Sequence, residues 1–120
     1  MAKYDIADRL LGFAARAGKV CDSLPRTRMG NHVAGQLVRC SSSPGSNYEE
    51  GCGAESRADF VHKLSVALKE TRESCFWLRL IVKAELLPQK RMASILDEGQ
   101  QLSAILAKSI VTAKANEGCK

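Results

Sequence analysis

Residues 56–86 contain neither proline nor glycine, and as a helix this stretch would be about 45 Å long at 1.5 Å per residue. When it is placed on a helix at 100° per residue, its side chains separate by chemistry. One arc, about 120° wide, is mainly apolar; it comprises Phe60, Leu64, Ala67, Thr71, Ser74, Cys75, Leu78, Ile81 and Val82. A second arc, about 100° wide, has Phe76 and Leu80 among its members; its basic residues are His62, Lys69, Arg72, Arg79 and Lys83, which we call the basic arc. The sequence therefore predicts a long helix with one packing face and one positively charged face, capped at its start by Ser56.

The same 3.6-residue period predicts three further helices. The first covers residues 4–21, with an apolar seam of Ile6, Leu10, Phe13, Ala17, Val20 and Leu24. The second covers residues 26–43, with inward positions Met29, Val33, Gln36, Leu37 and Cys40. The last covers residues 88–113, with a seam of Met92, Ile95, Gly99, Leu102, Leu106, Ser109 and Ala113.

The sequence SSSPGS at residues 41–46 interrupts the second helix pattern. Pro44 lacks a backbone N–H and its ring clashes with the preceding turn, so we expect a kink or break there, followed by a short helical piece over residues 46–51. Taken alone, the segment is equally typical of a loop. Four long helices joined by short connections predict an all-α, up-down-up-down four-helix bundle with a kinked second helix, formed by residues 1–120 as a single domain.

The composition is that of an ordinary folded domain, with 45% hydrophobic and 26% charged residues. The formal net charge of +5 modestly favours polyanionic partners. No apolar run approaches the roughly 18 residues that span a bilayer, so no membrane partner is expected. Asp5, Asp8 and Arg9 interrupt the N-terminal apolar pattern, which a secretory signal would not tolerate. A cytoplasmic protein is therefore expected.

No arrangement of residues indicates catalysis, a cofactor or a metal site. The cysteines at 21, 40, 52, 75 and 119 form no C-x-x-C pair and stand apart from both histidines, so reduced thiols are expected rather than zinc ligands. A carboxylate di-metal site would use Glu-x-x-His motifs, and none occurs. We therefore expect ion pairing of the glutamates, such as Lys69 with Glu73 one helical turn later, and no enzyme activity.

Two groups of side chains have more than one interpretation. Gln36 and Arg39 lie beside inward positions, which favours a structural polar layer with Glu50 or Glu73 over direct ligand contact. The basic arc is typical either of a nucleic-acid contact or of a face that only keeps the protein soluble. Apolar residues outside the main arc of the third helix exceed what one core can bury, which predicts an oligomer interface. The residues expected there are Phe76, Trp77 and Leu80.

The segments QLVRC (36–40) and KLSVALKETRESCFWLRL (63–80), with several positions between them, resemble a bacterial family. They are similar to the four-helix-bundle proteins encoded in intervening sequences of large-subunit ribosomal RNA genes. The accessory proteins of diversity-generating retroelements share this pattern. The matching positions are Gln36, Arg39, Asn47, Glu50, Ser56, Phe60, Lys63, Lys69, Glu70, Arg72, Glu73, Trp77 and Arg79. SSSPGS departs from the family pattern around the kink.

The resemblance implies a kinked four-helix bundle, a ring-like homopentamer and association with nucleic acid through a basic surface. The leading hypothesis is a non-catalytic, oligomeric accessory protein that binds RNA or DNA. The alternative is a structural or protein-interaction scaffold with no nucleic-acid ligand. A reverse transcriptase is a further expected partner if the gene lies beside a retroelement.

Overall fold

The computed structural model describes the backbone of residues 3–118 and the side chains of residues 6–116; Cys119 lies outside this range. The described part of the chain consists of four α-helices and contains no strand. They are α1 (Lys3–Ser23), α2 (Arg28–Cys52), α3 (Arg57–Lys83) and α4 (Gln89–Gly118). The predicted all-α architecture with four helices is confirmed.

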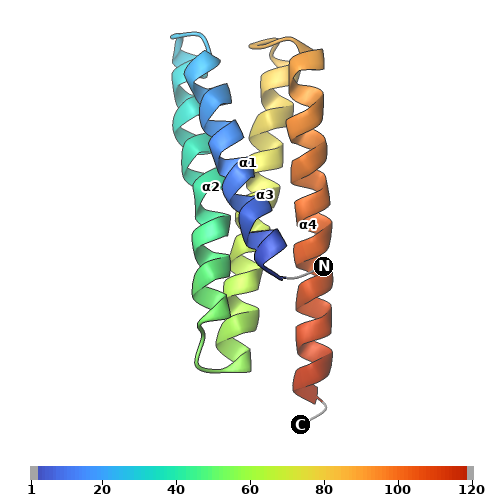
Figure 1. The fold of residues 1–120 in the computed structure, drawn as a ribbon. Coiled ribbons are helices and arrows are strands. Elements are labelled where there is room, and N and C mark those ends of the chain that lie inside the picture. The colour runs from blue at the N-terminus through green and yellow to red at the C-terminus, as the bar shows by residue number, and fades with distance from the viewer. Residues whose placement is uncertain (1–2, 119–120) are drawn as a thin grey trace.

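The helices run alternately up and down in an elongated bundle of 52 × 22 × 20 Å. The α1–α2 and α3–α4 connections lie at one end and the α2–α3 connection at the other (Figure 1). α3 packs against both α2 and α4, while α1 packs against α2 and, less extensively, against α4. α3 is therefore flanked on both sides, and its remaining face is the one that can meet solvent or a ligand.

The predicted seams form the core. The largest fully buried side chains include Leu10 and Phe13 of α1, Leu37 of α2 and Leu102 of α4. One inward prediction was wrong: Met29 is 45% exposed. Thr27 is the N-cap of α2, and its hydroxyl accepts from the Gly30 amide. Met29 therefore lies in the first turn of α2, at the end of the bundle, where fewer residues cover it.

α2 continues as one helix through Pro44. Of the kink or break expected there, the break does not occur, and neither does the loop that the segment alone would equally fit. Side chains on either side of Pro44 bond to backbone carbonyls of the same helix. The Ser42 hydroxyl donates to the Val38 carbonyl at 2.8 Å, and the Asn47 amide donates to the Ser43 carbonyl at 3.1 Å. Neither carbonyl is the one that Pro44 leaves without a backbone donor, which is that of Cys40. Pro44 itself is fully buried, so the packing of this stretch stabilises the helix across it. A bend of the axis at Pro44 stays a prediction.

Both ends of α3 are defined by hydrogen bonds. At the start, the Ser56 hydroxyl accepts from the Asp59 amide at 3.1 Å, which confirms the predicted cap. At the end, the Leu86 amide donates to the Ile81 carbonyl at 2.9 Å across Glu85, whose φ is 58°. This left-handed residue closes a Schellman motif. α3 therefore ends at Lys83 rather than near residue 86.

α4 closes the bundle through a close approach at Gly99. A Cβ at this position would lie 2.8 Å from the Cys75 Sγ and 3.2 Å from the Phe13 Cε1. Arg9 of α1 also donates to the Glu98 carboxylate at 2.8 and 3.0 Å. Side chains of α1, α3 and α4 thus meet at one level of the core, and a glycine allows this contact.

Candidate nucleic-acid interface

The basic arc lies on the exposed face of α3. All five of its residues are exposed, and with Phe76 they follow one line along the helix, because successive members are separated by three, four or seven residues. The line from His62 to Lys83 is about 32 Å long at 1.5 Å per residue. Within residues 6–116, none of the five forms an ion pair. The predicted positive face therefore exists and is accessible in the single chain.

Phe76 is the aromatic member of this line. Its side chain is 50% exposed, and it lies between Arg72 and Arg79 along α3. The neighbouring Trp77 ring contacts it edge-on, with ring centroids 5.0 Å apart and an interplanar angle of 80°. An aromatic ring held by a second ring and flanked by two guanidinium groups is therefore available on the surface.

A groove of about 650 Å³ runs between α3 and α4 beside this ring. Its α3 wall is formed by Phe76, Arg79, Leu80, Val82 and Lys83. Its α4 side is formed by Gln89, Met92, Ala93, Leu96, Asp97 and Gln100. Two residues of the basic arc thus line a groove that also has apolar walls. Sequence reasoning did not find the α4 residues, because the period of one helix does not reveal which neighbour lies across from it.

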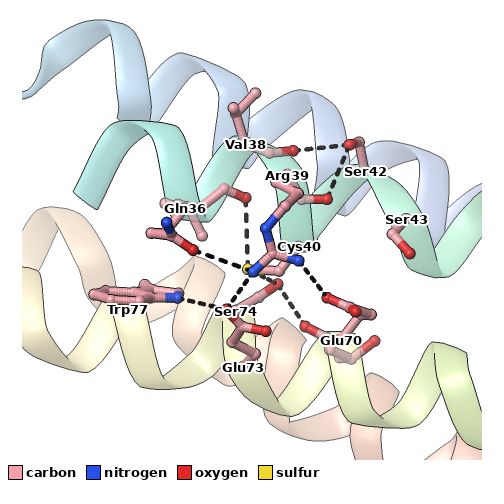
Figure 2. A network of polar contacts seen from close by, with 12 residues as sticks. Gln36, Val38, Arg39, Cys40, Ser42, Ser43, Glu70, Glu73, Ser74 and Trp77 are labelled. Carbon is pink, nitrogen blue, oxygen red and sulfur yellow. Dashed lines mark hydrogen bonds and ion pairs between the residues drawn. The ribbon is translucent and has the colours of Figure 1, made fainter. Parts of the chain in front are cut away.

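The predicted polar layer lies between α2 and α3 (Figure 2). The Arg39 guanidinium forms ion pairs with Glu73 and, at 3.2 Å, with Glu70. It also donates to the Gln36 side-chain oxygen at 3.2 Å, and the Trp77 indole N–H donates to the Glu73 carboxylate at 3.1 Å. The Arg39 side chain is 51% exposed, so this layer lies at the edge of the bundle.

Two predicted pairings were wrong. Glu50 is not part of this layer: its carboxylate pairs with Lys63 at 2.8 Å near the other end of the bundle. Glu73 does not pair with Lys69, because its carboxylate is directed toward Arg39 and the Trp77 indole. Glu70 was not predicted as a partner of Arg39, although its position one turn before Glu73 was the available signal. Because Arg39 pairs with both carboxylates, it offsets part of the negative charge beside the basic arc.

The three residues predicted for an oligomer interface occupy different environments. Trp77 and Leu80 are partly buried against the core of their own subunit. Trp77 packs between Phe76 and the His32 ring of α2, whose centroid is 5.6 Å away. Leu80 lines the α3–α4 groove. Phe76 alone among them is half exposed, so this flank offers less free apolar surface than the sequence indicates.

Burial makes three of the described cysteine thiols harder to deprotonate. Cys40 is fully buried, and burial raises the pKa of its thiol from 9.0 to about 11. Burial also raises the pKa of Cys21 and of Cys75. Among the described residues, no group of three or more metal-ligating side chains occurs. A search of the same residues finds no helix with the length and apolarity needed to cross a membrane.

Comparison with known proteins places this fold in a family. The sequence profile described as 23S rRNA-intervening sequence protein matches residues 2–108. The chain belongs to this family. A search of curated proteins finds no match.

A similar solved structure supports the fold of this family member. It is a crystal structure at 1.70 Å resolution of a protein with unknown function from the S23 ribosomal protein family of Bacteroides thetaiotaomicron VPI-5482. The two chains share 31% sequence identity and superpose with a TM-score of 0.84. The match covers 92% of this chain and 98% of the other. The four-helix arrangement of Figure 1 is therefore shared over almost the whole length of both chains.

Proposed function

We propose that this family member is a non-catalytic protein that binds RNA or DNA through the basic arc of α3. The observation that supports this most strongly is the exposure of all five arc residues, with no carboxylate paired to any of them in the described part of the chain. A helix face with charges of both signs interspersed would keep the protein soluble equally well, so solubility alone does not require a line of positive charges. A line of one sign along a single helix is better suited to a phosphate backbone.

The expected mode of binding follows from the chemistry of the arc. Lysine and arginine side chains contact phosphates without reading bases, so sequence preference should be weak. Bound counterions are released when phosphates are neutralised, so affinity should fall steeply as salt is raised. Arginine can bond two phosphate oxygens at once, and therefore Arg72 and Arg79 should contribute more than Lys69 or Lys83.

The proposal includes an oligomer, for which the family resemblance implies a ring-like homopentamer with a bent α2. Repetition of the basic arc around a ring would multiply the positive potential that one subunit presents. Leu11 and Val111, each 68% exposed, supply apolar surface for contacts between subunits. Light scattering on a sizing column should give about five times the 13.0 kDa mass of the chain. A monomer at micromolar concentration would refute this part of the proposal.

The test of nucleic-acid binding reverses charge on the arc. We expect Arg72→Glu with Arg79→Glu to abolish binding of labelled RNA and DNA oligonucleotides in fluorescence anisotropy. The matched control is Lys108→Glu with Lys114→Glu, which makes the same charge change at exposed positions of α4. Circular dichroism and light scattering must show unchanged helix content and mass in both variants. Equal binding by the arc variant and the parent would mean that the arc does not contact nucleic acid.

The alternative is a scaffold whose apolar surface docks another protein, and the exposed apolar side chains are the observation that favours it. A reverse transcriptase is the partner expected for that function if the gene lies beside a retroelement. Absence of nucleic-acid binding by the parent protein at low salt would favour this alternative.

A further inference from the structure

We infer that the ligand of the basic arc is a single-stranded nucleic acid and that one unpaired base enters the α3–α4 groove and stacks on Phe76. This inference rests on the proposed function and narrows it from nucleic acid in general to unpaired strands. Three features carry it: the position of Phe76, the distribution of charge across the groove, and the apolar floor of the groove.

Phe76 is placed for stacking. Its ring is half exposed and is braced edge-on by Trp77, so little side-chain freedom remains to be lost when a base packs on it. Arg72 and Arg79 lie one turn to either side on the same exposed line. Cations that follow a backbone, combined with an aromatic ring on which bases stack, are the recurring elements of single-strand binding. A duplex keeps its bases paired and would contact only the cations.

The charges of the groove orient the strand. Arg79 and Lys83 lie on the α3 wall, whereas Asp97 lies on the α4 side. A phosphate backbone is therefore attracted to the α3 wall and repelled from Asp97 on the opposite wall, which directs the base from α3 into the groove. The Asp97 carboxylate already accepts from the Gln101 amide at 2.7 Å, and a carboxylate can accept a further bond from an amino group on a base.

The floor of the groove is apolar. Leu80 and Leu96 are partly buried and Met92 is fully buried, so the groove ends on hydrocarbon and thioether rather than on charge. Gln89 and Gln100 add amide groups at its edge. Its volume of about 650 Å³ falls within the range of ligand-binding pockets. This combination suits the flat apolar faces and polar edges of a nucleobase.

The test compares one oligonucleotide in three forms: an unstructured labelled 12-mer strand, its duplex, and a strand of the same length that lacks bases. The contribution of base–aromatic stacking to affinity is large enough that Phe76→Ala should weaken binding of the 12-mer by about 5- to 150-fold. The same variant should leave the affinities for the duplex and for the abasic strand unchanged. Phe76→Trp, which keeps an aromatic ring at this position, should bind the 12-mer as tightly as the parent protein. Val38→Ala, at a residue of α2 that is 49% exposed, should leave the affinity for the 12-mer unchanged. The single tryptophan of the chain provides a second signal: its fluorescence should change with the 12-mer and not with the duplex.

The outcomes separate this inference from the proposed function. If Arg72→Glu with Arg79→Glu abolishes binding but Phe76→Ala does not weaken it, the base-stacking inference is overturned and the proposed function stands. If Phe76→Ala lowers the oligomer mass, Phe76 belongs to a subunit interface and the inference is likewise overturned. If the parent protein binds none of the three probes at low salt, both proposals fall.

Discussion

Replacing Gly99 with alanine tests the packing by which α4 closes the bundle. A methyl group there would lie 2.8 Å from the Cys75 sulfur and within 3.3 Å of the Phe13 ring. Both neighbours are buried, and the Phe13 ring is 1% exposed, so neither can move freely. Overpacking of this kind costs about 1–3 kcal/mol, whereas alanine in place of glycine gains about 1 kcal/mol in helix propensity.

The propensity gain can be measured separately at Gly35, which also lies inside a helix but has no atom within 4 Å of its hypothetical Cβ. Gly35→Ala should therefore raise the free energy of unfolding by about 1 kcal/mol. The two variants differ only in the steric clash, so Gly99→Ala should be less stable than Gly35→Ala by about 1–3 kcal/mol. At roughly 4 °C per kcal/mol, this corresponds to a melting-temperature difference of about 4–12 °C.

Thermal and urea unfolding, followed by circular dichroism, would provide these values. Protein concentration must be the same for all samples, because dissociation of an oligomer makes the melting temperature depend on concentration. If Gly99→Ala proves as stable as Gly35→Ala, α4 does not approach Phe13 and Cys75 as described, and the account of bundle closure is wrong.

Two further predictions concern the end of α3 and the buried thiol. Glu85→Gly should raise the free energy of unfolding by about 1 kcal/mol, because glycine adopts the left-handed conformation of this residue without strain. Thermal unfolding checks this. The control is Ala84→Gly, which should not be stabilising, because the φ of Ala84 is −86° and its backbone is not left-handed. Burial raises the pKa of Cys40 to about 11. As pH rises from 9 toward 11, the thiol therefore loses its proton in the unfolded chain but keeps it in the folded protein. The free energy of unfolding should fall over this pH range. Urea unfolding across this range should show a shallower fall for Cys40→Ala, and equal slopes for variant and parent would contradict the assignment.

The sequence predicted those features of the fold that depend on the period of a single helix. Leu64, Ala67, Leu78 and Ile81 are fully buried because they lie on the arc that the period assigned to packing. The Ser56 cap was equally predictable, because a serine with an acidic residue three positions later is a local sequence signature of a helix N-terminus. The exposure of the basic arc follows from the same periodicity.

The end of α3 and the continuity of α2 could not be predicted from this period. A left-handed residue that ends a helix is usually a glycine. At the end of α3 this residue is Glu85, which gives no such signal in the sequence. A proline normally ends or kinks a helix, but α2 continues through Pro44, whose side chain is fully buried. The prediction of a break was wrong because it used local sequence alone, which does not show that Pro44 packs into the interior of the bundle.

Contacts between helices were the least predictable part of the site. Glu73 had two cations within reach, Lys69 on its own helix and Arg39 on α2, and only the packing of α2 against α3 decides between them. The groove beside Phe76 likewise requires the register of α3 against α4. One helix alone carries no information about that register.

The most direct test of phosphate binding by the basic arc is the salt dependence of affinity for a single-stranded oligonucleotide. Each phosphate contact contributes about 0.7 to the slope of log affinity against log salt concentration. Arg72→Gln with Arg79→Gln removes two cations from the arc, so we expect a slope that is shallower by about 1.4. Lys108→Gln with Lys114→Gln, exposed on α4, should keep the parent slope. An unchanged slope in the arginine variant, or an equal loss in the lysine variant, would contradict the assignment of binding to α3.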